Sequence, residues 1–182
     1  MIILALGSNE SSSVATPKQA LGNALKELEI SGIHVRHTSN IYNTRADTYD
    51  PQPDFLNAII TIETSMPAST LLRLLKKIEA TAGRYATNSM LRPQHTRPRP
   101  LDLDIIDYKG RIYNWTKGVS GPRPRLVLPH PRAHERAYVL RPLVETAPDW
   151  HHPVFGLTAA QLLKRPLARD TGKITGCSGP LR

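Results

Sequence analysis

Strand-like and helix-like patterns of apolar residues follow one another along this chain in an order that few folds accommodate. Strand patterns occur in four segments, residues 1–6, 33–44, 55–64 and 101–106. One helical pattern separates the first two strands, and a second separates the last two. This β-α-β-β-α-β order predicts an α+β fold, the ferredoxin-like split β-α-β sandwich, in which helices pack on an antiparallel sheet. The second face of such a sheet stays available for a ligand or for extra segments.

The two main helical segments have recognisable ends. Thr16 and Gln19 fit a capping box, and leucines then recur at helical spacing up to Gly32. Residues 69–82 carry an apolar stripe, and Gly83 is placed to end that helix.

Shorter helices are expected in the C-terminal half. One begins near Ala133 and ends around Leu140 or Arg141, because Pro142 disfavours helical backbone at the residue before it. Residues 158–164 fit another turn or two of helix.

Length and cysteine content bound the domain organisation. A chain of 182 residues fits one domain with a full core, so we expect a single domain over residues 1–165. Residues 166–182 are rich in glycine and charge and are expected to form a loose tail. Cys177 is the single cysteine, which excludes an internal disulfide and favours a reducing, cytoplasmic compartment. The apolar start is too short for a signal peptide and no segment approaches a membrane span, so no membrane partner is expected. A monomer is expected as well.

The charge of the chain narrows the class of its ligand. Lysine and arginine number 24 against 15 acidic residues, which gives a net charge of +9. Such an excess favours a polyanionic partner, for example a nucleotide, a nucleic acid or an acidic membrane surface.

Two carboxylates alternate with leucines directly after a pair of arginines. If residues 101–106 form a strand, Asp102 and Asp104 share one face while Leu103 and its neighbours pack on the other. Carboxylates roughly 7 Å apart on a strand repel each other unless a cation or a basic group lies between them. This arrangement suggests magnesium held for a phosphate-bearing substrate, with Arg97 or Arg99 near the phosphates. The alternative is a solvated strand face with a surface ion pair.

Four further motifs accompany the acidic pair in a fixed order. They are Ala5-Leu6-Gly7-Ser8-Asn9, Gln52-Pro53-Asp54-Phe55-Leu56-Asn57, Gly83-Arg84, and Leu128-Pro129-His130 followed by Arg136-Ala137-Tyr138. Together with Asp102 and Asp104, this ordered set resembles the 6-hydroxymethyl-7,8-dihydropterin pyrophosphokinase family of folate-pathway enzymes. The resemblance runs from about Ile3 to Pro148 and extends weakly through the helix near Leu163.

The resemblance implies transfer of pyrophosphate from ATP to the hydroxymethyl group of the reduced pterin, with release of AMP and with two magnesium ions. By the same resemblance Asp102 and Asp104 would be the metal ligands, and these two with Arg84 and Arg99 would be the catalytic residues. The residues that match ATP-binding positions are Arg84, Arg99, Arg125, His130 and Arg136. Those that match pterin-binding positions are Thr44, Gln52, Phe55, Asn57 and Tyr138.

These residue types suit the implied chemistry. Guanidinium groups stay charged and grip phosphate oxygens by two bonds, and a flat heteroaromatic ring gains from stacking on both faces. Several positions also have plainer interpretations. Arg84 fits a cation at a helix C-terminus, Phe55 fits a core residue, and His130 fits a hydrogen-bonded turn. A zinc site built on His130 and His134 is disfavoured because two ligands flanked by prolines are too few.

The chain departs from the family pattern at three places where the family contacts its substrates. Residues 45–48 read Arg-Ala-Asp-Thr where the family has a run like Pro-Pro-Leu-Gly. The segment between Arg84 and Arg99 is longer than in the family and lacks its tryptophan. Lys76 stands where many relatives have glutamine, which predicts an altered adenine or phosphate contact. Residues 45–54 and 85–100 are expected to close over bound ATP.

Two alternatives remain open at this point. One is a basic nucleic-acid-binding module on a ferredoxin-like fold, motivated by the net charge and the arginines between residues 92 and 99. Only 5% of residues are aromatic, and acidic residues lie among the arginines, so no nucleic-acid partner is expected. The other is a diverged relative with altered pterin specificity, motivated by residues 45–48.

Overall fold

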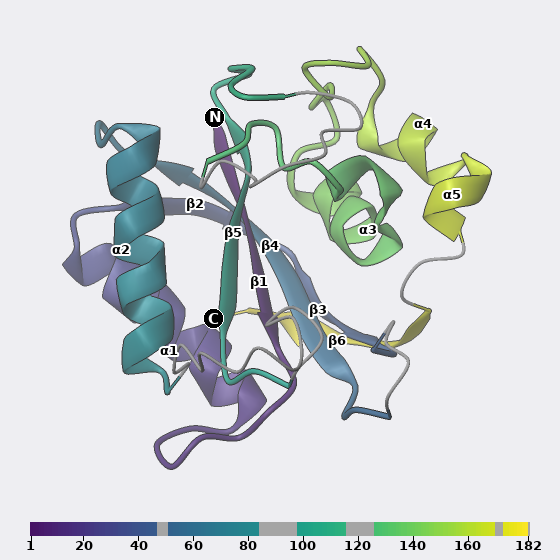
Figure 1. Ribbon diagram of the computed structural model, residues 1–182. Coiled ribbons are helices and arrows are strands. Elements are labelled where there is room, and N and C mark those ends of the chain that lie inside the picture. Colours follow the sequence, from purple (N-terminus) through teal and green to yellow (C-terminus); the bar gives the residue numbers. More distant parts are fainter. Residues whose placement is uncertain (47–50, 84–97, 116–125, 170–172, 182) are drawn as a thin grey trace.

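The fold is of the α+β class and is built on one antiparallel sheet (Figure 1). This computed structural model describes residues 1–46, 51–83, 98–115, 126–169 and 173–181. The strands pair in the order β5-β1-β4-β3-β6, with β2 also paired to β4. Their bounds are β1 (Ile2–Ser8), β2 (His34–Thr38), β3 (Asn40–Thr44), β4 (Phe55–Glu63), β5 (Asp102–Tyr108) and β6 (Ile174–Pro180). The predicted α+β class with helices on an antiparallel sheet is confirmed.

Helices lie on both sides of the sheet (Figure 1). One side carries α1 (Pro17–Ile30) and α2 (Ala68–Thr81). The other side carries the short helix η2 (Ala133–Glu135), α3 (Ala137–Thr146), α4 (Ala159–Leu163) and α5 (Pro166–Arg169). Each of the two longest helices has 14 residues, and no helix in the described ranges is long and apolar enough to cross a bilayer.

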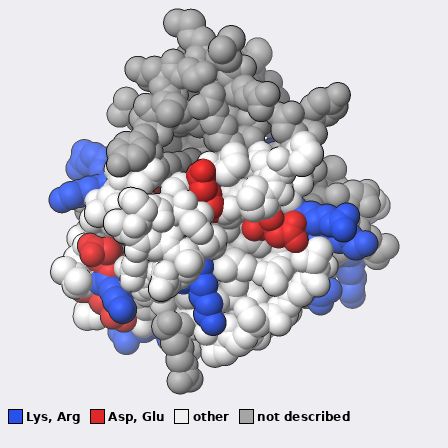
Figure 2. Space-filling view, turned by 90° about the horizontal axis from the view of Figure 1, so that it is seen from below, with Lys and Arg blue, Asp and Glu red and all other residues white. Residues whose placement is uncertain are grey.

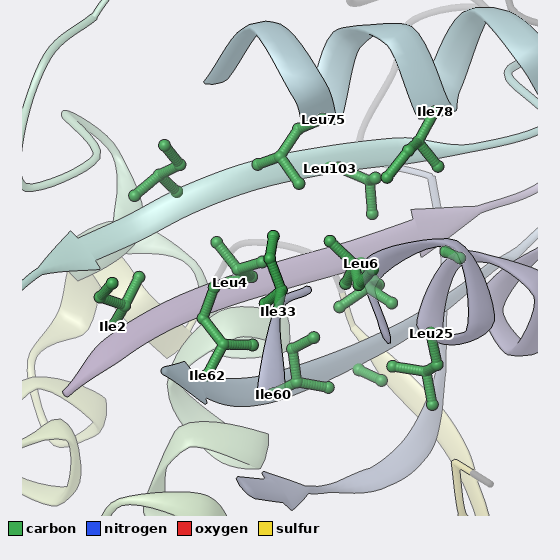
Figure 3. Packing of buried hydrophobic residues seen from close by; sticks show 14 of the residues in the cluster. Ile2, Leu4, Leu6, Leu25, Ile33, Ile60, Ile62, Leu75, Ile78 and Leu103 are labelled. Atoms are coloured by element: carbon green, nitrogen blue, oxygen red, sulfur yellow. The ribbon is translucent and has the colours of Figure 1, made fainter. Parts of the chain in front are cut away.

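Side chains alternate between the two faces of the sheet along the central strands, so these strands contribute to a hydrophobic core on each face. Leu4 and Ile60 point towards α1 and α2, where Leu75 and Ile78 of α2 lie over Leu103 of β5 (Figure 3). The odd-numbered residues Ile3 and Ile59 pack instead in the cluster under α3 and α4. This cluster also contains Ile106, Val139, Leu140, Leu143, Trp150 and Leu162. Asp102, Asp104 and Asn57 lie on this second face of the sheet.

The predicted helix ends are largely confirmed. Thr16 and Gln19 form a capping box at α1, in which the Gln19 N–H donates to Thr16 Oγ1 at 3.4 Å and the Thr16 N–H to Gln19 Oε1 at 2.9 Å. Gly83 follows α2 with φ of 98°, a conformation that a side chain would strain. A second capping box, at Thr158, opens α4 within the predicted segment.

The structure corrects the predicted end of the third helix. Pro142 lies inside α3, which continues to Thr146. A proline in a helix interior removes one backbone hydrogen bond, but burial of Val139, Leu140 and Leu143 against the sheet outweighs that loss.

Two further segments differ from their predicted structure. Residues 33–44 form two strands rather than one, because the strand is interrupted at Ser39. The Ser39 Oγ accepts a hydrogen bond from the Ile59 N–H at 2.9 Å. Residues 174–180 form the edge strand β6 against β3, where a loose tail was expected. Main-chain pairing with an existing edge orders this segment without an apolar pattern of its own.

A buried histidine makes the stability of this fold depend on pH. His152 is fully buried among the rings of Trp115, Trp150 and Phe155. Burial, reinforced by the nearby His134, lowers the pKa of His152 to about 4. Its Nδ1 accepts a hydrogen bond from the Val154 N–H at 3.2 Å, so the neutral ring is the form that fits.

Acidification is therefore expected to destabilise the protein through His152. The unfolded chain binds this proton near pH 6.5 and the folded chain only near pH 4, so stability falls as the pH drops through that window, by about 3 kcal/mol in all. His152→Asn keeps an acceptor near Nδ1 and should flatten the dependence, as measured by urea unfolding between pH 7 and pH 4. The exposed His151→Asn serves as the control and should keep the wild-type dependence. Parallel curves for wild type and His152→Asn would contradict this assignment.

Candidate active site

Two rows of residues cross β5, β1 and β4 and form the floor of the site. Asp102 pairs with Gly7, which pairs with Asn57, and Asp104 pairs with Ala5, which pairs with Ile59. Leu103 and Ile105 point into the opposite core, so the predicted alternation of β5 is confirmed. The side chains of Asp102 and Asp104 are 21% and 32% exposed, so both carboxylates are reachable from solvent.

We refer to the place where Asp102, Asn57 and Phe55 meet over Gly7 as the hollow. A Cβ at this position would lie 3.1 Å from Asn57 Oδ1 and 3.9 Å from both Asp102 Cβ and Phe55 Cδ1. The absence of a side chain therefore lets Asp102, Asn57 and Phe55 approach one another over the strand.

Arg99 joins the acidic side of the hollow to the aromatic side. Its Nε lies 3.2 Å from Asp102 Oδ2, and its guanidinium carbon lies 5.1 Å from the centroid of the Phe55 ring. The first contact is a charge-assisted pair and the second has the geometry of a cation–π interaction. Arg99, Asp102 and Phe55 thus form one contiguous group.

Asn9 fastens the two loops that border the hollow. Its Oδ1 accepts from the Arg99 N–H at 2.8 Å, and its Nδ2 donates to Gln52 Oε1 at 3.3 Å and to the Pro53 carbonyl at 3.1 Å. Asn9 is 2% exposed. Asn9 belongs to one of the sequence motifs, but its role could not be predicted because its partners are more than 40 residues away in the chain.

Four side chains lie together at the other end of the hollow: Thr44, Gln52, Phe55 and Asn57. Asn57 Nδ2 donates to Thr44 Oγ1 at 2.7 Å, and Thr44 pairs with Phe55 across β3 and β4. Gln52 is held by Asn9. The structure therefore brings together four of the five residues predicted for the pterin.

His130 faces the second carboxylate. Its backbone N–H donates to the Ile106 carbonyl at 2.9 Å, which places the ring beside β5, and its Nε2 lies 3.7 Å from Asp104 Oδ2. Nδ1 accepts from the Arg132 N–H at 3.1 Å, so Nε2 carries the proton in the neutral ring. Burial lowers the pKa of His130 and outweighs the opposing effect of Asp104. His130 thus presents an N–H donor next to Asp104.

His134 is directed away from this site. Its ring packs 4.7 Å from the Phe155 centroid and its Nε2 lies 3.3 Å from Glu135 Oε1. In the described parts of the chain no three His, Cys, Asp or Glu side chains are grouped so as to hold a metal ion by themselves.

Arg136 and Tyr138 contribute from the start of α3. The Arg136 guanidinium lies 5.6 Å from the Tyr138 ring centroid, and its buried Nε has no hydrogen-bond partner among the described residues. Burial raises the pKa of the Tyr138 hydroxyl, while the charges of Arg136, Arg132 and Arg99 oppose that rise. Arg84 and Arg125, the other two predicted arginines, lie outside the described residues.

The comparisons with known proteins agree with this arrangement. The family described as 7,8-dihydro-6-hydroxymethylpterin-pyrophosphokinase (HPPK) matches residues 3–148. A 2-amino-4-hydroxy-6-hydroxymethyldihydropteridine pyrophosphokinase of Synechocystis is 38% identical over 146 residues, which are 80% of this chain and 67% of that protein. The protein of the same name from Haemophilus influenzae is 35% identical over 147 residues, which cover 80% of this chain and 81% of that protein.

A longer relative and a solved structure are also similar to this chain. The folic acid synthesis protein fol1 of Pneumocystis carinii is 32% identical over 169 residues, which are 93% of this chain and only 20% of that protein. A solved structure titled as HPPK-DHPS in complex with substrates shares the fold, with a TM-score of 0.56 at 13% identity, covering 88% of this chain and 42% of that one. The extent of the family match, together with these relatives, shows that the chain belongs to the 7,8-dihydro-6-hydroxymethylpterin-pyrophosphokinase family.

Proposed function

We propose that this chain transfers a pyrophosphoryl group from ATP to the hydroxymethyl group of 6-hydroxymethyl-7,8-dihydropterin in folate biosynthesis. In this reaction the hydroxymethyl oxygen bonds to the β-phosphorus of ATP, the bond from that phosphorus to the α-phosphate oxygen breaks, and AMP leaves with a proton released to solvent. The observation that carries the proposal is the shared floor on which Asp102, Asp104 and Arg99 adjoin the Phe55–Asn57 end of the hollow.

Asp102 and Asp104 fit the role of magnesium ligands. Both are partly exposed carboxylates on one face of β5, and Mg²⁺ is commonly held by one or two carboxylates together with substrate phosphates and water. The two carboxylates would hold two ions in the proposed complex. When bound, such ions offset the negative charge that builds on the transferred group and on the leaving oxygen.

The basic residues would hold the triphosphate. Arg99 is fixed at Asp102 and presents a planar guanidinium to the hollow, a geometry that suits phosphate oxygens. His130 contributes a neutral N–H donor beside Asp104, and the buried Nε of Arg136 is a further donor in need of an acceptor. Arg84 and Arg125 are proposed for the same role by family resemblance.

The opposite end of the hollow would take the pterin. Phe55 supplies a stacking face, Tyr138 is proposed for the other face, and Asn57 offers both a donor and an acceptor to the polar ring edge. Thr44 fixes the orientation of the Asn57 amide, and Gln52 borders the pocket. Positioning of this kind supplies much of the rate enhancement in phosphoryl transfer.

The proposal also covers the domain division, the compartment and the oligomeric state. Residues 1–165 would form the catalytic domain and residues 166–182 an appendage that includes β6. We propose that the protein acts in the cytoplasm and as a monomer. Size-exclusion chromatography with light scattering tests the oligomeric state.

A nucleic-acid-binding function is not favoured. On the face shown in Figure 2, acidic and basic side chains of the described residues are interspersed rather than gathered in one basic patch. The proposed ligand site itself carries two carboxylates, which would repel a phosphate backbone in the absence of metal ions.

The product of ATP distinguishes the proposed reaction from other phosphoryl transfers. The purified chain, incubated with ATP, magnesium and 6-hydroxymethyl-7,8-dihydropterin, should form AMP and the pterin diphosphate in equal amounts. Reversed-phase chromatography separates AMP from ADP. Formation of ADP, or no consumption of ATP by folded protein, would refute the proposal.

Gly7→Ala is expected to weaken use of the pterin while sparing the nucleotide. The added methyl group would press on Asn57 Oδ1 at 3.1 Å, and Thr44 restrains the amide from moving away. We expect kcat/KM for the pterin to fall about tenfold, because small displacements of positioning groups are costly. Affinity for a nonhydrolysable ATP analogue, measured by calorimetry, should change less than about twofold, since the Asp102 contact at 3.9 Å is an ordinary one.

Gly179→Ala is the matched control, because a Cβ there meets nothing within 4 Å. It should behave as wild type in both assays. An unchanged kcat/KM in Gly7→Ala would show that the hollow does not seat the pterin.

A further inference from the structure

Two charged side chains of α2 cover the open edge of the sheet at β5. Glu79 Oε1 accepts from the Leu103 N–H at 2.7 Å, and Lys76 Nζ donates to the Leu103 carbonyl at 3.1 Å. Lys76 Nζ also lies 2.7 Å from Glu79 Oε1. Because β5 ends the strand order, these contacts satisfy peptide groups that would otherwise face solvent at an edge.

The same lysine reaches one of the two proposed metal ligands. Lys76 Nζ lies 4.0 Å from Asp104 Oδ1, although Lys76 starts from the helix side of the sheet and Asp104 points to the other side. The ammonium therefore extends around the edge strand. Its contacts with Leu103 and with Glu79, which is 3% exposed, hold it there.

We propose that Lys76 is a built-in counter-cation for Asp104 that weakens binding of divalent metal to the nucleotide-free protein. This inference rests on the proposed function, because it assumes that Asp102 and Asp104 bind the metal ions. An ammonium within about 4 Å of a carboxylate offsets part of the attraction that the carboxylate exerts on an incoming cation. Moving Lys76 away would remove a charged partner of the buried carboxylate of Glu79, which is costly.

The consequence is that metal occupancy depends on the nucleotide. A triphosphate brings several negative charges to the site and outweighs the single positive charge of Lys76. Metal ions would then enter chiefly together with ATP, and the free protein would remain mostly without them. Lys76 thus acts indirectly, through the charge of Asp104, and is a positioning residue rather than a catalytic one.

Binding of Mn²⁺ to the nucleotide-free protein tests this role. The electron paramagnetic resonance signal of free Mn²⁺ gives its affinity without any turnover. Lys76→Gln should bind Mn²⁺ about three- to tenfold more tightly than wild type, as expected for removal of a partly exposed like charge. Lys76→Arg keeps the charge and should resemble wild type, as should Lys77→Gln, which changes an exposed neighbour.

Further variants make the result specific to the site. Asp104→Asn combined with Lys76→Gln should abolish the gain in affinity. If Lys76→Gln fails to fold by circular dichroism, the double variant Lys76→Gln/Glu79→Gln, which removes both charges of the pair, replaces it.

Equal or weaker Mn²⁺ binding by Lys76→Gln, or a gain that survives Asp104→Asn, would overturn this inference. A clear gain in a protein that forms no AMP would instead contradict the proposed function and leave the role of Lys76 intact.

Discussion

Asp102→Asn should lower kcat at least about a thousandfold while the protein stays folded, because it removes one of two carboxylates proposed to hold the magnesium ions. The fold should be retained since Asp102 is partly exposed and relief of its repulsion from Asp104 offsets the weakened pair with Arg99. AMP release under saturating substrates gives kcat, and thermal unfolding in the absence of metal reports stability, which should change little.

Asp149→Asn provides the control, because Asp149 is an exposed aspartate on a turn and is not one of the proposed site residues. It should keep wild-type turnover. Full activity in Asp102→Asn would show that the carboxylates of β5 do not carry the reaction.

Arg99→Ala should lower kcat/KM by about two to three orders of magnitude. The residue pairs with Asp102 and stacks on Phe55, so its loss would affect both the triphosphate and the pterin ends of the hollow. Arg99→Lys should recover little of this loss, because an ammonium lacks the planar fork that meets phosphate oxygens and an aromatic face together. Steady-state kinetics with each substrate varied in turn separates the two effects.

Arg73→Ala removes an exposed arginine of α2 and should leave the kinetics unchanged. If Arg99→Lys matched wild type, Arg99 would act as a simple positive charge and the geometric argument would be wrong.

Local patterns in the sequence were sufficient for much of the scaffold. The period of two around Asp102 and Asp104 predicted which side of β5 packs, because side chains of a strand alternate wherever one face is buried. The capping box at Thr16 and the glycine at position 83 marked helix ends for equally local reasons.

Features that depend on distant contacts were not predictable in this way. Pro142 is tolerated because tertiary packing of α3 outweighs a local penalty, and β6 forms because β3 offers it a free edge. The loop-fastening role of Asn9 and the reach of Lys76 to Asp104 involve partners that only the folded sheet brings near.

The candidate site combines both kinds of information. The shared face of Asp102 and Asp104, with an arginine nearby, followed from spacing alone, whereas Phe55, Asn57, His130 and Tyr138 were proposed by family resemblance. The structure places Phe55 against Arg99 and His130 against Asp104, which no local pattern could have indicated. Their roles towards substrates are proposals that the variants above can test.

A crystal structure with Mn²⁺ and a nonhydrolysable ATP analogue would decide whether the acidic pair holds the metal–nucleotide complex. We expect anomalous scattering peaks for two ions at about 2.0–2.2 Å from carboxylate oxygens of Asp102 and Asp104, with the triphosphate contacting the same ions and Arg99. Bound nucleotide whose phosphates and metal ions avoid both aspartates would contradict the proposed site.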